Sequence, residues 1–193
     1  MQNNNLSSDT TVILLAIEAW FRNNVDGKLD NKKIGIILYF TNLFSPLFNI
    51  KYPFPYQINL KDESFIFSNI KEHIDILIKE KLIEKNNNSY SITQAGIQKV
   101  RYLTENKEYK EYYDIAIITR EITSFFSTVE NDFFLEQGLI SFENHGNAYN
   151  INNISKIVLE FYPSDRCPTS KESIHRYLTY IHFLCIKFSY IKK

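Results

Sequence analysis

Three side chains near the C-terminus are of types that could do chemistry together. His175, His182 and Cys185 are spaced by seven and three residues along a helix that we expect over residues 170–190. Imidazole and thiolate groups can bind a metal ion or act as nucleophiles, but seven residues span about two helical turns, too far for joint ligation without outside ligands. We therefore expect all three to be structural residues of an amphipathic helix.

The rest of the chain carries no motif of a known catalytic class. The sequence has no GxSxG elbow, P-loop, HExxH motif or glycine-rich dinucleotide fingerprint, and its five glycines stand singly. The two cysteines, Cys167 and Cys185, form no CxxC pair. The sequence therefore predicts a protein that is not an enzyme and has no metal, no cofactor and no small-molecule substrate.

Composition allows one substantial core or two small ones. The 193 residues are 44% hydrophobic and 15% aromatic, and 22 basic side chains balance 22 acidic ones. No net charge draws the whole molecule to nucleic acid or to an anionic membrane. The apolar run over residues 12–21 is short and contains Glu18, which argues against a signal peptide or a membrane span. We expect a cytoplasmic protein with no membrane contact.

The N-terminal segment, residues 1–50, should be a pair of helices. Ser8 or Asp9 can cap the first, which should stop near Asn23, and Asp30 can cap the second, which should end before Pro46. In residues 51–60, two prolines forbid a helix interior and favour an extended strap on the surface.

Residues 51–104 have the element order of a winged helix. After the strap, an amphipathic helix should run from about Phe65 to residue 81, in the place of a recognition helix. Two short strands, at residues 82–83 and 90–92, flank an asparagine-rich turn, and Thr93 can cap a further helix. The expected fold class is mainly α with small β-hairpin wings.

The second half of the chain should begin with a long connecting helix. The apolar stripe predicts this helix from about residue 108 to 134, and we assign it residues 105–135. Residues 132–158 echo the winged segment, so residues 136–193 would hold a second, degenerate wing or an ordinary hairpin, followed by a basic C-terminal helix. A second wing would make the winged helix tandem, and we expect the segments to form one compact unit.

Charge decides how the winged segment is interpreted. Duplex DNA binding relies on Lys and Arg, yet residues 61–85 hold five lysines against six acids. Residues 166–193 are more basic, with Glu172 as their only acid, and these side chains are nucleic-acid-binding candidates unless they complement the acidic residues 122–165 within the fold. The candidates are Arg166, Lys171, Arg176, Lys187, Lys192 and Lys193.

Aromatic side chains provide the candidates for binding another protein. Tyrosine and phenylalanine are enriched at the centres of protein interfaces. The strap aromatics could instead simply cover the helix pair. The candidate partner-binding residues are Tyr52, Phe54 and Tyr56 in the strap and Tyr109, Tyr112 and Tyr113 in the long helix.

Residues 34–123 resemble a family of bacterial defence proteins. An apolar helix is followed by the strap YPFPYQINL, a helix ending in LIKEKLIEK, the strand SYSIT and the segment LTENKEYKEYYDIAIITREI. This succession resembles the middle component of ABC-three-component anti-phage systems, including the small subunit of Lamassu-type complexes. The resemblance implies a non-enzymatic adaptor that joins an SMC-like ATPase to a nuclease or other effector, as winged helices bind proteins in the related kleisin-interacting tandem winged-helix proteins.

Two other functions fit the sequence. In a dimeric winged-helix transcription regulator, the long helix would dimerise, and Asn69, Lys71, Lys79 and Asn87 would touch DNA. In a nucleic-acid-sensing subunit, the basic C-terminal helix would make the contact. For the adaptor, DNA contact is secondary, and the partner face should include the 65–81 helix, the wing and the long helix.

Overall fold

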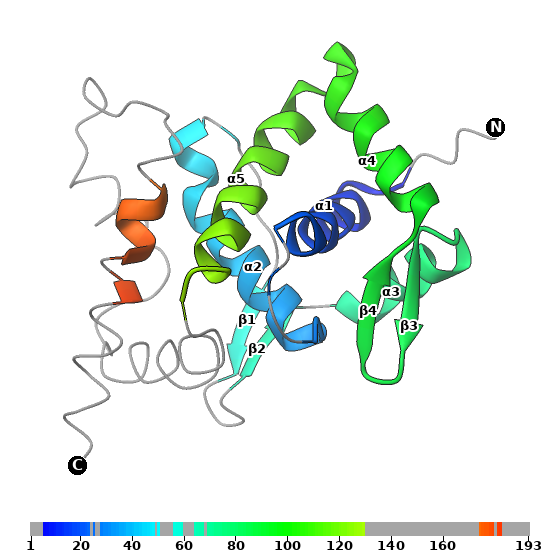
Figure 1. Ribbon diagram of the computed structural model, residues 1–193, viewed down its shortest axis with the longest axis horizontal. Helices are drawn as coiled ribbons and strands as arrows, with labels where there is room; N and C mark the ends of the chain where they lie inside the picture. The colour runs from blue at the N-terminus through cyan, green and yellow to red at the C-terminus, as the bar shows by residue number, and fades with distance from the viewer. Residues whose placement is uncertain are drawn as a thin grey trace.

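The computed structural model describes residues 6–23, 25, 28–48, 50, 56–59, 64–67, 69–129, 174–179 and 181–182, and of residues 47, 56–59 and 64–67 it describes the backbone only. This part of the chain is mainly helical with small β-hairpins (Figure 1), as the sequence predicts, although one of the two hairpins was not predicted. The elements are α1 (Ser8–Arg22), α2 (Asn31–Phe44), the 3₁₀ turn η1 (Ser45–Phe48), β1 (Tyr56–Asn59), β2 (Ser64–Phe67), α3 (Ile70–Lys79), β3 (Ile83–Asn86), β4 (Ser89–Ile92), α4 (Gln94–Glu105), η2 (Lys107–Tyr109) and α5 (Lys110–Phe126).

Helix α1 lies at the centre of the fold, with α2, α3, α4, α5 and β4 packed around it (Figure 1). Every residue from Thr10 to Trp20 is buried, as expected for a helix that is covered on all sides. Its N-cap is Ser7, whose hydroxyl accepts a hydrogen bond from the Thr10 amide (3.3 Å). The prediction of Ser8 or Asp9 was therefore wrong by one or two residues, because Ser7 is the residue with extended backbone geometry before the first turn.

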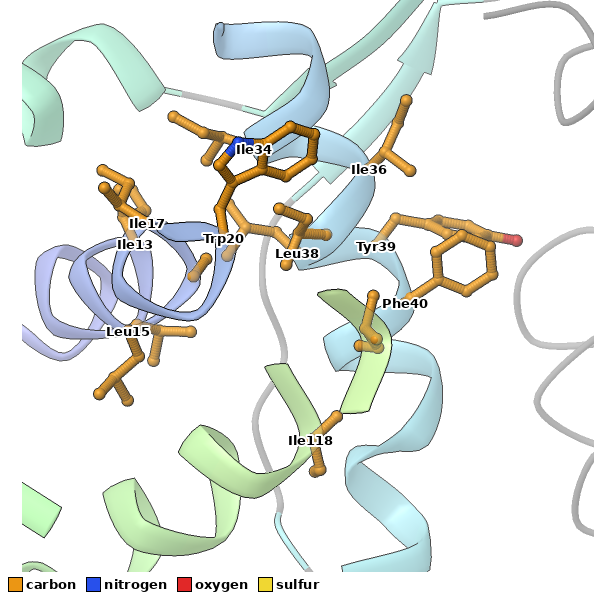
Figure 2. Packing of buried hydrophobic residues seen from close by; sticks show 14 of the residues in the cluster. Ile13, Leu15, Ile17, Trp20, Ile34, Ile36, Leu38, Tyr39, Phe40 and Ile118 are labelled. Carbon is orange, nitrogen blue, oxygen red and sulfur yellow. The ribbon is translucent and has the colours of Figure 1, made fainter. Parts of the chain in front are cut away.

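Helix α2 begins and ends as predicted. The Asp30 carboxylate accepts a hydrogen bond from the Lys33 amide (2.9 Å), and the helix ends two residues before Pro46. Figure 2 shows side chains from α1 and α2 directed toward one another, including Trp20 from α1 and Ile34 and Leu38 from α2. Together with residues of α5, they form one continuous hydrophobic core.

A β-hairpin replaces the start of the predicted 65–81 helix. Strand β2 pairs antiparallel with β1, with Tyr56 opposite Phe67, and α3 starts only at Ile70. The sequence Ser-Phe-Ile-Phe of β2 is rich in residues that favour strands, and β1 supplies hydrogen-bond partners for its backbone. Asn69, which precedes α3, has a left-handed backbone conformation (φ 63°) that separates hairpin from helix. The strap residues 51–55 lie outside the described residues.

Helix α3, the β3–β4 hairpin and α4 follow one another as predicted. Ile83 pairs with Ile92, and Asn87 at the turn adopts the left-handed conformation (φ 56°) that asparagine tolerates. The Thr93 hydroxyl caps α4 by accepting from the Gly96 amide (3.0 Å). The Tyr90 amide donates to the Leu29 carbonyl (2.9 Å), which joins β4 to the segment before α2.

The predicted long helix of residues 108–134 is shorter in the structure. Helix α4 ends at Glu105, η2 follows Asn106, and α5 runs only from Lys110 to Phe126. The Ser127 amide still donates to the Thr123 carbonyl, four residues back, but the Thr128 amide donates to the Phe125 carbonyl, only three residues back, so the α-helical pattern stops at Phe126. The apolar stripe of α5 packs against α1 and α2, so α5 is a core helix. The part of the stripe from Ile115 to Phe126 is buried within the fold, while Tyr113 stays exposed.

Of the expected C-terminal helix, residues 174–179 and 181–182 are described, and they are helical. Ile174 and Leu178 are buried, and the Tyr177 ring packs against Phe44 of α2 with centroids 6.0 Å apart.

The hairpin or second wing expected in residues 136–193, and the 132–158 echo, lie outside the described residues. Among the helices described, none combines the length and apolar character needed to cross a bilayer.

Candidate protein-docking surface

Two surfaces carry the candidate residues, and the first is the corner where α4 turns through η2 into α5 (Figure 1). The turn is local in origin. Asn106 leaves the helical conformation (φ −85°, ψ 121°), and its side chain accepts a hydrogen bond from the Glu108 amide (3.0 Å), which starts η2. Helices α4 and α5 also pack against each other, so the corner is held by tertiary contacts. We call this region, residues 99–113, the tyrosine corner.

Three tyrosine rings meet in the tyrosine corner. The ring centroids of Tyr102 and Tyr109 are 6.1 Å apart, and those of Tyr109 and Tyr112 are 6.0 Å apart. The Lys99 ammonium lies 5.7 Å from the centroid of Tyr102, within cation–π range. Charge interaction with Tyr102 is the main cause that raises the pKa of Tyr109.

Two cavities open at the corner. One, of about 330 Å³, is lined by Thr104, Glu105, Asn106, Lys107, Lys110 and Tyr113. The other, of about 190 Å³, is lined by Leu6, Thr11, Lys99, Leu103, Tyr109 and Tyr112. Tyr102 and Tyr113 leave 46% and 48% of their surface exposed. The corner thus combines exposed aromatic area with shallow hollows.

The second surface is the outward side of α3. Its exposed residues are Lys71, Glu72, Asp75, Ile76 and Lys79, so two lysines offset two acids around an isoleucine that is 42% exposed. The opposite side of α3 is held to the N-terminal end of α1. A hydrogen bond of 2.9 Å joins His73 Nδ1 to the Thr10 hydroxyl, and His73 Nε2 lies 3.9 Å from an Asp9 oxygen. This attachment fixes which side of α3 faces solvent.

The partner-binding candidates from the sequence divide into two groups. The structure brings Tyr109 and Tyr112 together, and Tyr113 lines a cavity of the same corner. Sequence reasoning missed Tyr102, although its spacing of seven residues from Tyr109 could have suggested it. Tyr52 and Phe54 lie outside the described residues, and of Tyr56 the structure describes only the backbone, as the first residue of β1.

Of the nucleic-acid-binding candidates, only Arg176 is described; it is exposed on the helical residues 174–179. Arg166, Lys171, Lys187, Lys192 and Lys193 lie outside the described residues. The residues proposed to touch DNA in a regulator are not gathered on a basic face. Lys71 and Lys79 share their side of α3 with Glu72 and Asp75.

His175 and His182 pack around one aromatic ring. Both lie edge-on to Phe125 of α5, at centroid distances of 6.0 and 6.2 Å, and His175 Nε2 also lies 3.4 Å from a Glu121 oxygen. Burial lowers the pKa of His182. Cys185 lies outside the described residues, and within the described part of the chain no group of three or more His, Cys, Asp or Glu side chains is placed to hold a metal ion.

Comparison with known proteins gives no relative for this chain. No family model matches it, and no curated protein and no solved structure shows significant similarity to it.

Proposed function

We propose that this protein is a non-catalytic adaptor subunit of a bacterial anti-phage defence complex, acting in the cytoplasm. In this proposal it bridges an SMC-like ATPase and a nuclease or other effector, and it binds them through the outward side of α3 and the tyrosine corner. The observation that carries the proposal is Ile76, an isoleucine 42% exposed at the centre of a helix face whose charges cancel. Protein interfaces have apolar residues at their centre and polar residues at their rim, which is the arrangement of Ile76 and its charged neighbours on α3.

The order of elements supports a winged-helix origin for this surface. A winged helix has a short extended segment between its first two helices that joins the sheet of the wing; here residues 28–30 form no strand, but the Tyr90 amide bonds to the Leu29 carbonyl before α2. In this proposal, helix α3 and the β3–β4 hairpin correspond to the recognition helix and the wing. Whether a second wing makes the fold tandem depends on residues 132–158, which are outside the described residues.

Two features favour protein over DNA as the ligand of this winged helix. In a DNA-binding helix-turn-helix, about three or four residues join the two helices, whereas η1 and the β1–β2 hairpin separate α2 from α3 here. Glu72 and Asp75 on the exposed side of α3 would also lie toward the phosphates of a duplex, where Lys and Arg are needed.

The test is co-purification from a cell that expresses the tagged protein together with its natural gene neighbourhood. A large ATPase and a nuclease or other effector should be captured by the wild-type protein. Ile76→Asp should lose at least one of them, since it buries a charge in the interface. Phe21→Asp, which changes a similarly exposed apolar residue at the C-terminal end of α1, is the matched control and should retain both.

Two results would refute the adaptor. One is the failure of the wild-type protein to capture any ATPase. The other is tight, sequence-dependent retardation of DNA by the isolated protein at moderate salt, lost in Lys71→Glu and Lys79→Glu, which would support the transcription regulator instead. Both α3 variants change exposed side chains, so a melting temperature equal to that of the wild-type protein should confirm that they fold.

A further inference from the structure

Of the two cavities of the tyrosine corner, the smaller lies below the usual size of a small-ligand pocket and the larger lies at its lower limit. Pockets for small ligands usually measure about 300–1,000 Å³ and bury most of the ligand. The cavities here measure about 190 and 330 Å³, and each has a lining that mixes tyrosine rings with polar groups. A chain that crosses the corner could place one side chain in each hollow.

The charge of the linings selects for acidic groups. Lys99, Lys107 and Lys110 line the cavities, and the only acid in either lining is Glu105. Glu105 lies 3.5 Å from the Arg101 guanidinium, which partly neutralises it. The cavity linings therefore carry an excess of positive charge, although the molecule as a whole is neutral.

The same corner is poorly suited to nucleic acid. Single-stranded nucleic acid binds by stacking bases on free aromatic faces along a continuous basic groove. The Tyr102 ring is already in contact with Lys99 and Tyr109. Glu108 and Glu111 are exposed in the same corner, so residues 99–113 hold four basic side chains against three acidic ones, too small an excess for a continuous phosphate backbone.

We propose that the tyrosine corner binds an acidic segment of a partner protein. Carboxylates of the segment contact Lys107 and Lys110, and a leucine or phenylalanine side chain enters the cavity beside Tyr109 and Tyr112. The inference deepens the proposed adaptor function by naming the chemistry of one partner, and it rests on that function for its biological role. The binding chemistry itself depends only on the corner.

The test uses the whole chain and a fluorescently labelled synthetic peptide in which glutamate alternates with leucine and phenylalanine. Binding of the peptide is measured by fluorescence anisotropy. Saturable binding is expected, and it should weaken as salt is raised. The double variant Lys107→Glu with Lys110→Glu should weaken binding by at least about tenfold, because two attractive contacts become repulsive. Tyr109→Ala should weaken it as well, through loss of the ring beside the smaller cavity.

The matched control is the double variant Lys28→Glu with Lys85→Glu. It makes the same charge change at two exposed lysines outside the corner, one in the segment before α2 and one in β3, and it should bind the peptide like the wild-type protein. A peptide with lysine in place of glutamate should not bind. The proposal is overturned if the acidic peptide fails to bind, if both double variants lose binding equally, or if oligothymidine binds more tightly and loses binding in the corner variant.

Failure of this inference can be told apart from failure of the adaptor. If the wild-type protein captures its ATPase and effector, and the Lys107→Glu with Lys110→Glu variant captures both as well, the adaptor stands and the acidic-segment site is refuted. If the wild-type protein captures neither but binds the acidic peptide at the corner, the site stands and the adaptor is refuted.

Discussion

Glu18 is an acidic residue in a buried position. Its side chain is only 4% exposed, among apolar neighbours on α1. Two guanidinium groups compensate its charge: Arg22 one turn later (2.6 Å) and Arg120 of α5 (3.3 Å). Asn23 adds a hydrogen bond to the Arg120 carbonyl (2.7 Å). This cluster fastens the C-terminal end of α1 to α5, so Glu18 interrupts the apolar run for a structural reason.

Replacing Glu18 by glutamine should lower the free energy of unfolding by about 2 kcal/mol. The change keeps the shape of the side chain but leaves two arginines without their charge partner. The matched control is Arg101→Gln, which breaks an exposed pair with Glu105 and should cost less than about 0.5 kcal/mol. Urea unfolding of the three proteins measures both values, and equal losses would show that the Glu18 cluster adds nothing beyond a surface pair.

The lowered pKa of His182 predicts how stability depends on pH. Because burial favours the neutral ring in the folded protein, the unfolded state binds more protons between the two pKa values. Stability should therefore fall as the pH drops below 6.5, the ordinary pKa of histidine, and should recover above it. His182→Gln should show a shallower loss over the same range in urea unfolding. An unchanged slope would mean that other groups cause the acid sensitivity.

At the scale of elements, capping hydrogen bonds set the helix ends, and the sequence predicts only some of these caps. The caps at Asp30 and Thr93 could be predicted, because their carboxylate or hydroxyl reaches an amide three residues later. The strand at residues 64–67 was mistaken for helix, since four residues with one apolar stripe fit both periods and only the pairing with β1 decides. The expected long helix likewise ends at Phe126 although the apolar pattern continues.

Gly96 fixes how closely α4 approaches the β3–β4 hairpin. A Cβ atom at this position would lie 2.2 Å from the Leu82 carbonyl oxygen and 2.8 Å from an Ile92 carbon. Gly96→Ala should therefore lower the free energy of unfolding by about 2 kcal/mol, although alanine favours helix, because the backbone contact must open.

Gln98→Ala, an exposed substitution in the same helix, is the control for Gly96→Ala, and its effect should lie within about 0.5 kcal/mol of zero. Thermal or urea unfolding measures both changes. If Gly96→Ala is as stable as the wild-type protein, the hairpin and α4 are not held in the close contact described here.

At the scale of the molecule, the fold is organised around one helix. Helices α2, α3, α4 and α5 all contact α1, and the helical residues 174–179 extend the core beyond α2 and α5. The outward side of α3 and the tyrosine corner both lie on helices that pack against α1. Partner binding at either surface would therefore act on rigidly held helices, which limits the entropy lost on docking.

Leu178→Ala tests whether the C-terminal helical residues belong to this core. Leu178 is fully buried, so the truncation should lower the free energy of unfolding by about 2–4 kcal/mol in a single cooperative transition. Thr179→Ala changes the neighbouring exposed residue and should alter stability by less than about 0.5 kcal/mol. Calorimetry distinguishes the outcomes, and two separate transitions would show that this helix folds independently of α1.

The sequence by itself determined the elements whose signals are local. These elements are helices α1 and α2 with their apolar periodicity, the asparagine turn between β3 and β4, and most of the helix caps. Each depends on residues that lie within a few positions of one another in the chain. It also determined the absence of catalytic motifs and the neutral charge of residues 61–85.

Only the tertiary structure decided what depends on residues far apart in the chain. It pairs Tyr90 with Leu29, joins Glu18 to Arg120, and places Tyr102 against Tyr109 across the turn between α4 and α5. These contacts form only when the helices are packed together, because the burial and the hydrogen bonds that stabilise them involve several segments at once.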